Sequence, residues 1–127
     1  MKDASDAAVW PTVDRLCAWL DAAAERPAEQ ELLLRVLKLA EEVGETAQAV
    51  IGASGQNPRK GYSHTWRDVE SELCDVVLTA MVTLRTLTPD AEGVFAEHLR
   101  KVAERSLGSA PCTAPGATPD PGPATTG

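Results

Sequence analysis

The sequence predicts an all-α fold: a four-helix bundle-like domain over residues 1–107, followed by a disordered tail over residues 108–127. Strands have little support, because the chain contains one Phe and one Tyr and no run of alternating β-branched residues. Apolar residues recur at helical spacing instead. The tail holds five of the nine prolines and four of the nine glycines. Without large apolar residues it cannot offset the entropy cost of ordering.

Local signals place the first two helices. The first is expected from about Thr12 to Glu25 and ends before Pro27, because the residue preceding a proline disfavours the α region. The second is expected from about Ala28 to Ile51 and ends at Gly52, since glycine commonly terminates a helix. The polar stretch that follows, GASGQNPRKGYSH, is predicted to be a loop.

The third and fourth helices have clear start signals. Thr65 is a capping residue, and Asp68 three positions later takes the place of the glutamate of a capping box, so a helix is expected from there to about Leu87. Thr88 followed by Pro89 is a second start signal, which predicts a helix to about residue 107.

The third helix predicts more than one chain in the bundle. Its segment ELCDVVLTAMVTL, residues 72–84, is apolar nearly all the way round, and such a helix is buried on most sides. Four helices of one chain can hardly surround it. We therefore expect a second copy of the chain to complete the core.

Charge and composition exclude several classes of protein. The net charge of −7 argues against nucleic-acid binding, which depends on Lys and Arg neutralising phosphates. It also means that a phosphate ligand needs a bridging cation. No membrane span and no signal-peptide pattern are present, so a cytoplasmic protein is expected. The three cysteines are odd in number and lack metal-like spacing, which indicates reduced thiols.

Two acidic clusters are candidates for a functional site. KLAEEVGE spans residues 38–45, and ESELCDVV spans residues 70–77. Glu42 and Glu45 are three residues apart, as are Glu72 and Asp75, so each pair lies on one face of its helix. The same two-carboxylate unit is therefore expected on two successive helices.

These clusters have two interpretations. Most acidic clusters on helices are solvated faces. Against that, Glu41 and Glu45 form a repulsive pair four residues apart, and Lys38 precedes the acids, which is the less favourable orientation. Asp75 lies within the apolar run LCDVVLTAMV, where an ionised carboxylate without a partner is costly. A compensating cation is therefore expected.

Magnesium, with manganese as an alternative, fits this ligand set best, because it prefers carboxylate, water and phosphate oxygens. Zinc favours histidine or cysteine ligands, and the two histidines, His64 and His98, lie outside the clusters. A ferritin-like iron site needs Glu-x-x-His units, which the sequence lacks.

KLAEEVGE followed by ESELCDVV resembles the signature of the MazG-like nucleotide pyrophosphohydrolase family, the all-α NTP pyrophosphatase superfamily. In that family an E-x-x-E unit and an E-x-x-D unit on successive helices bind magnesium. The resemblance covers residues 32–87. It implies the MazG fold and a Mg-dependent hydrolysis of a nucleoside triphosphate between the α- and β-phosphates, which yields a nucleoside monophosphate and pyrophosphate in nucleotide-pool housekeeping. It also implies a homodimer or a dimer of dimers, with the site formed at a subunit interface.

The resemblance also assigns roles to individual residues. Glu41 corresponds to the carboxylate that orients the attacking water and deprotonates it. Ser71 stands where many relatives carry a second acid. The metal ligands implied by the resemblance are Glu42, Glu45, Glu72 and Asp75.

Four further residues are candidates for substrate binding. Lys38 either meets the incoming phosphate or holds a carboxylate. Arg59 and Lys60 lie in the glycine-rich loop and either contact the triphosphate or only solvate the loop. Trp66 either stacks on the base or packs against a neighbouring chain. In mid-helix, Gly44 indicates a close approach by the third helix or by the ligand.

Two other functions stay open at this point. A non-catalytic or weakly active helical dimer that binds nucleotide or a protein partner has the same fold. A carboxylate-based metal-storage or redox bundle is the third possibility, and it needs histidine ligands that the acidic clusters do not contain.

Overall fold

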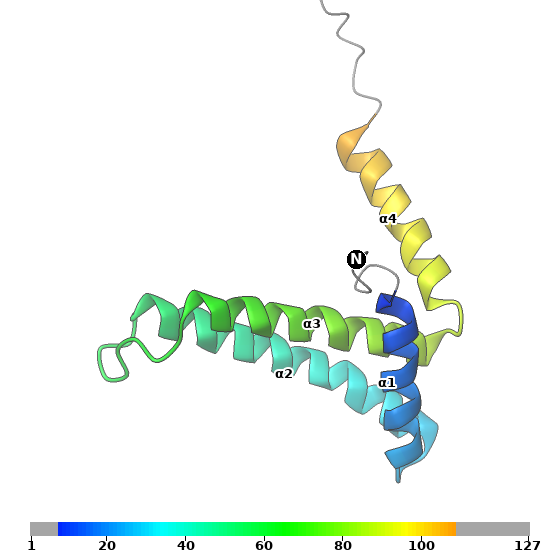
Figure 1. The fold of residues 1–127 in the computed structure, drawn as a ribbon, viewed down its shortest axis with the longest axis horizontal. Coiled ribbons are helices and arrows are strands. Elements are labelled where there is room, and N and C mark those ends of the chain that lie inside the picture. Colours follow the sequence, from blue (N-terminus) through cyan, green and yellow to red (C-terminus); the bar gives the residue numbers. More distant parts are fainter. Residues whose placement is uncertain (1–7, 109–127) are drawn as a thin grey trace, which may run out of the picture. The chain divides into compact units, whose positions relative to one another are not determined.

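The computed structural model describes residues 8–108. This part of the chain is all-helical, as predicted, and contains no strand (Figure 1). The chain divides into two compact units after Phe95. The expected disordered tail lies, from residue 109 on, outside the described residues. No helix in the described part is long and apolar enough to cross a bilayer. The helices are α1 (Val9–Ala23), α2 (Ala28–Ser54), α3 (Trp66–Leu87) and α4 (Ala91–Leu107).

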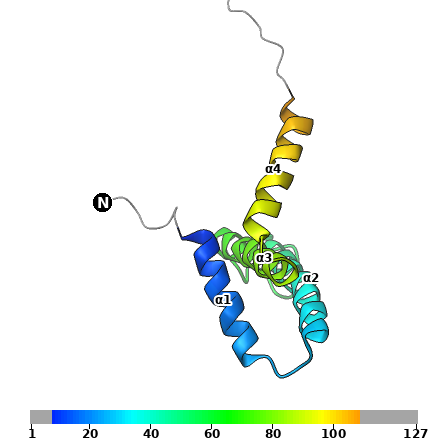
Figure 2. The same ribbon diagram turned by 90° about the vertical axis from the view of Figure 1, so that its right-hand side faces the viewer.

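The first unit is built on α2 and α3. These two helices run antiparallel and side by side, and α1 packs against α3 (Figures 1 and 2). Ala49 and Ala53 of α2 and Val69 of α3 form the buried cluster between the long helices. Alanine side chains let two helix backbones approach closely but bury little apolar area. The α2–α3 contact therefore leaves the chain with a small core.

α2 ends later than predicted. It continues through Gly52 to Ser54, and Gly55 takes the left-handed conformation at the C-cap (φ 64°). Gly52 is required for another reason, because a β-carbon at this position would lie 2.2 Å from Nδ1 of His64. The first glycine thus gives room to the returning loop, and the second glycine ends the helix.

The start of α3 confirms the predicted capping box. The backbone N–H of Asp68 donates to Oγ1 of Thr65 (3.3 Å), and the backbone N–H of Thr65 donates to Oδ2 of Asp68 (2.7 Å). The hydrogen bond from the backbone of Thr65 lowers the pKa of the Asp68 carboxyl. Two backbone donors at the helix start are thereby satisfied.

α1 and α4 are shifted relative to the prediction. α1 spans residues 9–23 rather than 12–25. α4 starts at Ala91 rather than Pro89, because Thr88 is the extended residue that ends α3. The Thr88 hydroxyl accepts a hydrogen bond from the backbone N–H of Asp90 (3.2 Å). Thr88 thus ends α3 and also stabilises the turn into α4, so it does not mark the first residue of α4.

Arg35 of α2 joins the three helices of the first unit. Its guanidinium donates to Oδ1 of Asp21 in α1 (2.8 Å) and to Oγ1 of Thr86 in α3 (2.7 Å). The hydroxyl of Thr83 donates to the backbone carbonyl of Arg35 (3.4 Å). Only 10% of the Arg35 side chain is exposed, so these polar contacts stand where a bundle usually has apolar packing.

α3 is not buried on most sides within the single chain; its burial was expected only with a second copy, and that expectation stays a prediction. Leu73 and Val77 are 50% and 59% exposed, and Val13 is the one large side chain of the described part that is fully buried. Nineteen large hydrophobic residues of this part are exposed. Exposure on this scale marks an interaction surface rather than a finished core.

In the second unit, α4 is stabilised by pairs along its own surface. Arg100 forms ion pairs with Glu97 (2.8 Å) and Glu104, and Lys101 pairs with Glu97 (3.7 Å). These exposed pairs lie three or four residues apart, where opposite charges favour the helix weakly because solvent screens them.

Replacing Thr65 with alanine is expected to lower the free energy of unfolding by about 1 kcal/mol, because it removes a helix N-cap. A loss of this size lowers the melting temperature by about 4–8 °C in a domain of about 100 residues. Circular dichroism during heating measures it. Ser71→Ala is the matched control, since its hydroxyl donates only to the carbonyl of Arg67 in the same helix (3.1 Å). Equal losses in both variants would contradict the capping role.

Arg35→Met is expected to lower the free energy of unfolding by roughly 2 kcal/mol, because it removes charge-assisted hydrogen bonds from a buried site. Urea unfolding measures the change. Arg26→Met is the control: the Arg26 side chain is 59% exposed and pairs with Glu31 (3.5 Å), and such surface pairs contribute about 0–1 kcal/mol. Indistinguishable losses would show that the Arg35 contacts do not hold the helices together.

Candidate metal centre

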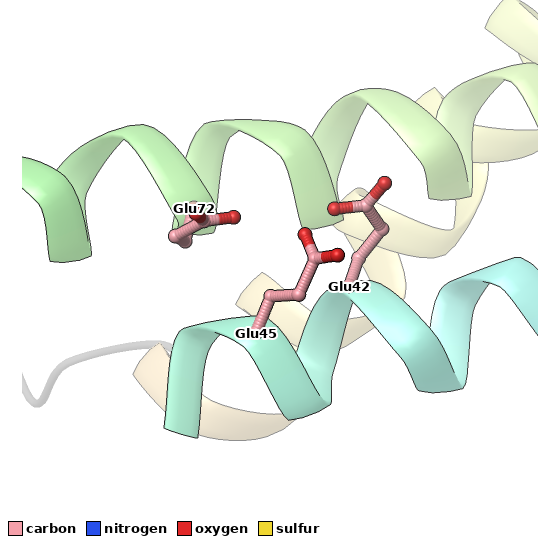
Figure 3. A group of neighbouring side chains, drawn as sticks. All are labelled: Glu42, Glu45 and Glu72. Carbon is pink, nitrogen blue, oxygen red and sulfur yellow. The ribbon is translucent and has the colours of Figure 1, made fainter. Parts of the chain in front are cut away.

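Three carboxylates meet between α2 and α3 (Figure 3). Glu42 and Glu45 of α2 and Glu72 of α3 each offer one oxygen, and these oxygens all lie within 4.8 Å of one another. Glu42 is buried, while Glu45 and Glu72 are half-buried. We call this group the three-carboxylate cluster. The antiparallel pairing of α2 and α3 brings together three of the four carboxylates that the sequence singled out.

One oxygen of the cluster has no hydrogen-bond partner in the described part of the chain. Oε2 of Glu72 is buried and accepts no hydrogen bond there. Buried polar atoms almost always have a partner, and an exception calls for a specific explanation such as a bound ion. A cation held by the Glu72 carboxylate would give this oxygen a partner.

The close negative charges affect Glu45. Its pKa is raised, first by the charge of Glu42, then by burial and by the charge of Glu72. Carboxylates this close resist simultaneous ionisation unless a proton or a cation offsets their charge. A hard cation relieves the repulsion and reverses the direction of the pKa shift.

Lys38 holds one of the carboxylates. Its Nζ lies 3.1 Å from Oε1 of Glu42 and 3.7 Å from Oε2 of Glu41, and the hydrogen bond to Glu42 raises the pKa of Lys38. Of the two roles expected for this lysine, its contacts in the structure match the holding of a carboxylate. One ammonium cannot offset the full charge of the cluster.

Asp75 lies outside the cluster and is exposed. The expectation that the apolar run of α3 buries this carboxylate is wrong for the single chain, because its neighbours Leu73 and Val77 are also exposed. Glu41 is likewise exposed, with 62% of its side chain accessible. Both acids are in contact with water and do not need a cation to compensate burial.

The spacing of the cluster admits hard divalent cations of different size. With magnesium bonds of about 2.1 Å, opposite ligand atoms lie about 4.2 Å apart and adjacent ones about 3 Å apart, so separations of up to 4.8 Å need small side-chain shifts to close around this ion. Calcium, with bonds of about 2.3–2.6 Å, needs smaller shifts. The all-carboxylate donor set disfavours zinc. The cluster thus indicates a hard cation and does not by itself choose between these metals.

Gly44 does not mark a close approach by α3. A β-carbon at this position meets nothing within 4 Å, and the residue is exposed. The prediction that the third helix approaches here is therefore wrong. The glycine lies on the side of α2 that the described residues leave uncovered.

A cavity of about 460 Å³ lies between α1, α2 and α3. Its wall is largely apolar and includes Trp19, Leu34 and Leu78. Lys38 connects this cavity to the cluster, because it lines the cavity and contacts Glu42. The sequence did not predict this cavity, since its three walls come from segments far apart in the chain.

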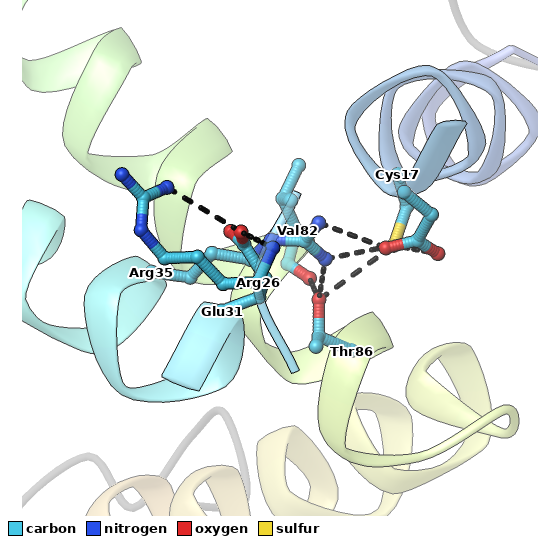
Figure 4. Close-up of polar contacts among 7 residues, drawn as sticks. Cys17, Arg26, Glu31, Arg35, Val82 and Thr86 are labelled. Atoms are coloured by element: carbon cyan, nitrogen blue, oxygen red, sulfur yellow. Dashed lines mark hydrogen bonds and ion pairs between the residues drawn. The ribbon is translucent and has the colours of Figure 1, made fainter. Parts of the chain in front are cut away.

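Sequence reasoning also missed Arg35, whose polar contacts Figure 4 shows. Arg35 lines this cavity and a second one of about 300 Å³. The signal was available, because Arg35 lies within the apolar run LLLRVL. This is the pattern that drew attention to Asp75, and of the two charged residues Arg35 is the buried one. A charge within an apolar run does not reveal on which side of its helix it lies.

The predicted substrate-binding residues of the α2–α3 loop are exposed. The side chains of Arg59, Lys60 and Trp66 form no hydrogen bond or ion pair with the described part of the chain. The loop itself is fixed by close packing, since a β-carbon on Gly55 would lie 2.6 Å from the ring of Tyr62. The roles of the three exposed side chains therefore stay predictions.

Comparison of the chain with protein-family models, with curated proteins and with solved structures gave no match. The resemblance to the MazG-like family therefore rests on the carboxylate pattern alone.

Glu45→Gln is expected to raise the melting temperature of the metal-free protein at neutral pH. A carboxyl whose pKa is raised by folding binds more protons in the folded than in the unfolded state, so its contribution to stability falls as the pH rises through that pKa. The gain from the substitution is therefore largest at neutral pH and vanishes below the ordinary glutamate pKa of 4.5. Thermal unfolding in EDTA across this pH range measures it.

Glu97→Gln is the control of opposite sign. Hydrogen bonds from Arg100 lower the pKa of Glu97, so its ionised form stabilises the folded state, and that contribution is lost as the pH falls through the folded pKa. This variant is expected to melt at a lower temperature at neutral pH. If both variants lose stability, the carboxylates of the cluster do not repel each other as described.

Proposed function

We propose that the protein is a magnesium-dependent nucleoside triphosphate pyrophosphohydrolase of the MazG-like type. The observation that carries this proposal is the three-carboxylate cluster, in which Oε2 of Glu72 is buried without a partner. A protein with a net charge of −7 repels a triphosphate. A divalent cation held by the cluster, when bound, offsets phosphate charge and lowers the pKa of a bound water.

Glu42, Glu45 and Glu72 are the residues that hold the cation. Asp75 follows Glu72 by three residues on the same face of α3, and as an exposed side chain it is free to turn towards a bound ion. Ser71 does not add a donor, because its hydroxyl is directed to the helix backbone. Manganese accepts the same oxygen ligands.

The nucleoside fits the neighbouring cavity. A volume of about 460 Å³ falls within the usual range of about 300–1,000 Å³ for small-molecule sites. The indole of Trp19 in its wall offers a base a surface on which to stack. Lys38, at the boundary between cavity and cluster, meets the first phosphate.

The order of sites along α2 gives the substrate a direction. The cavity involves residues 31–38 of α2, the cluster residues 42–45, and the loop begins after Gly55. Nine residues of helix from Glu45 to Ser54 span about 14 Å. With the base in the cavity, the distal phosphates extend towards this loop, where Arg59 and Lys60 are free to contact them.

The reaction transfers the α-phosphoryl group to water. A bond forms between the water oxygen and the α-phosphorus, the bond from that phosphorus to the α,β-bridging oxygen breaks, and pyrophosphate leaves. Glu41 accepts a proton from the water, and its exposed carboxylate is accessible for this step. Lys38, 3.7 Å away, orients that carboxylate.

We also propose that the protein is a cytoplasmic homodimer or dimer of dimers that acts in nucleotide-pool housekeeping. The incomplete core supports the association, because most large apolar side chains of the described part are at least partly exposed. Burying them against another copy supplies the apolar area that the single chain lacks.

Pyrophosphate release tests the activity. With Mg²⁺, the purified protein is expected to release pyrophosphate and a nucleoside monophosphate from at least one member of a panel of canonical and modified triphosphates. Glu42→Gln and Glu72→Gln are expected to lower kcat by about 100-fold or more, because each removes a ligand of the cation. Glu29→Gln, an exposed acid in the first turn of α2, is the matched control and is expected to leave kcat unchanged.

Nucleotide binding distinguishes the alternatives. EDTA is expected to abolish binding of the triphosphate, and binding that survives EDTA would overturn the metal-dependent mechanism. Binding that needs Mg²⁺ but gives no pyrophosphate from any substrate identifies the non-catalytic nucleotide-binding dimer instead. If neither binding nor hydrolysis is observed on the whole panel, the cluster does not serve a nucleotide.

A further inference from the structure

α2 has two opposite faces, and the one that is apolar is uncovered. Towards α3 the helix places Arg35, Glu42 and Ala49, which are buried and follow each other at intervals of seven residues. On the side away from α3 it carries nine apolar or small residues, all exposed in the structure. We call this row the outer face of α2: Leu33, Val36, Leu37, Ala40, Val43, Gly44, Ala47, Val50 and Ile51.

The outer face is a continuous stripe. At about 100° per residue, its nine positions fall within roughly 140° of the helix circumference, away from the direction of Glu42. Leu33, Leu37 and Val43 are 63%, 64% and 52% exposed. No charged residue lies within this arc between residues 33 and 51. An exposed apolar stripe about 28 Å long on an acidic protein is an interaction surface.

The sequence of the outer face is nearly the same when read in either direction. Reversal about a point between Val43 and Gly44 exchanges eight of the nine positions with one another, and large residues coincide with large ones except at the centre. Leu33, at the end of the row, has Ser54 as its counterpart. The exchanged pairs are Val36 with Ile51, Leu37 with Val50, Ala40 with Ala47, and Val43 with Gly44. A surface with this symmetry is complementary to a second copy of itself in antiparallel orientation, which is what a two-fold axis requires.

We propose that the outer face of α2 is the centre of a homodimer in which α2 packs antiparallel against α2 of a second copy, with the two-fold axis passing between Val43 and Gly44. The small residues at the centre let the two backbones approach closely, and the larger residues at both ends pack around that crossing. The open space beside Gly44 is the room that the second helix takes. Two copies of an acidic chain meet here without bringing like charges together.

The size of the stripe shows what else the interface contains. A stripe about 28 Å long on a helix about 10 Å across presents roughly 280 Å² in projection, whereas a stable interface buries about 800 Å² on each partner. The α2 pair is therefore the core of a wider contact. Leu73 and Val77 lie one turn apart on α3 and are 50% and 59% exposed. Both side chains are available to extend the contact.

This interface does not depend on the proposed activity. The three-carboxylate cluster faces α3, and the outer face points away from it, so a dimer formed in this way leaves both clusters open. The mass and cross-linking experiments below therefore test the dimer independently of the substrate panel.

Steric variants test the interface by mass. Light scattering after size exclusion is expected to give twice the 13.5 kDa of the chain for the unmodified protein, or four times that mass if two such dimers associate. Gly44→Leu meets no obstacle within its own chain but fills the crossing point, so it is expected to raise the dimer dissociation constant at least tenfold, and Leu37→Glu is expected to act in the same direction. Val9→Gln, at an exposed apolar residue of α1, is the matched control and leaves the mass unchanged.

Cross-linking tests the orientation without disturbing the packing. In a background with Cys74→Ser and Cys112→Ser, which retains the buried Cys17, the double variant Ala40→Cys/Ala47→Cys is expected to form intermolecular disulfides on mild oxidation. Ala40→Cys alone is expected not to, because its own copy across the axis lies about 10 Å along the helix from it, beyond the reach of a disulfide.

The outcomes decide the proposal. A monomeric unmodified protein, or a dimer that survives both Gly44→Leu and Leu37→Glu, overturns it. A parallel arrangement gives efficient cross-linking of Ala40→Cys alone and also overturns it. A dimer that dissociates in Leu99→Glu but not in Gly44→Leu assigns the interface to α4 instead.

Discussion

The rest of the structure depends on the charged row that α2 turns towards α3. Helices in bundles usually bury their apolar stripe, whereas α2 buries Arg35 and Glu42. Arg35 is compensated within the chain by hydrogen bonds to α1 and α3. Glu42 has the ammonium of Lys38, which does not balance three carboxylates. The contact between the two long helices is therefore favourable at its alanine-lined end and repulsive at the cluster until a cation binds.

This inversion of α2 decides where the apolar residues lie. With the charged row inside, the outer face is left in water, and Val13 is the one large side chain of the described part that is fully buried. A chain of this length with so small a core has little stability of its own. Anything that binds only the folded form adds to its stability. The proposed cation on one side of α2 and the proposed second copy on the other would be two such ligands.

The sequence predicted what depends on local spacing and failed where the direction of a helix face was needed. The four helices, the capping box of Thr65 and the meeting of Glu42 with Glu72 all follow from residues a few positions apart and from antiparallel pairing. The burial of Asp75 was predicted and Arg35 was overlooked, because an apolar run on either side does not show which way a charged side chain points. Only the packing of α2 on α3 shows that the outer face of α2 points away from α3.

The two faces of α2 meet in one short segment. Val43 and Gly44, the centre of the proposed dimer, lie between Glu42 and Glu45, which supply two carboxylates of the cluster. Glycine loses more conformational freedom on ordering than any other residue, so this segment is the costly one to fix in a helix. A cation bound on one side or a helix packed on the other fixes the same turn. If either the cation or the second helix binds first, this turn is already ordered, and the other binding event costs less entropy. By linkage, the cation would strengthen dimerisation by the same factor by which dimerisation would raise the affinity for the cation.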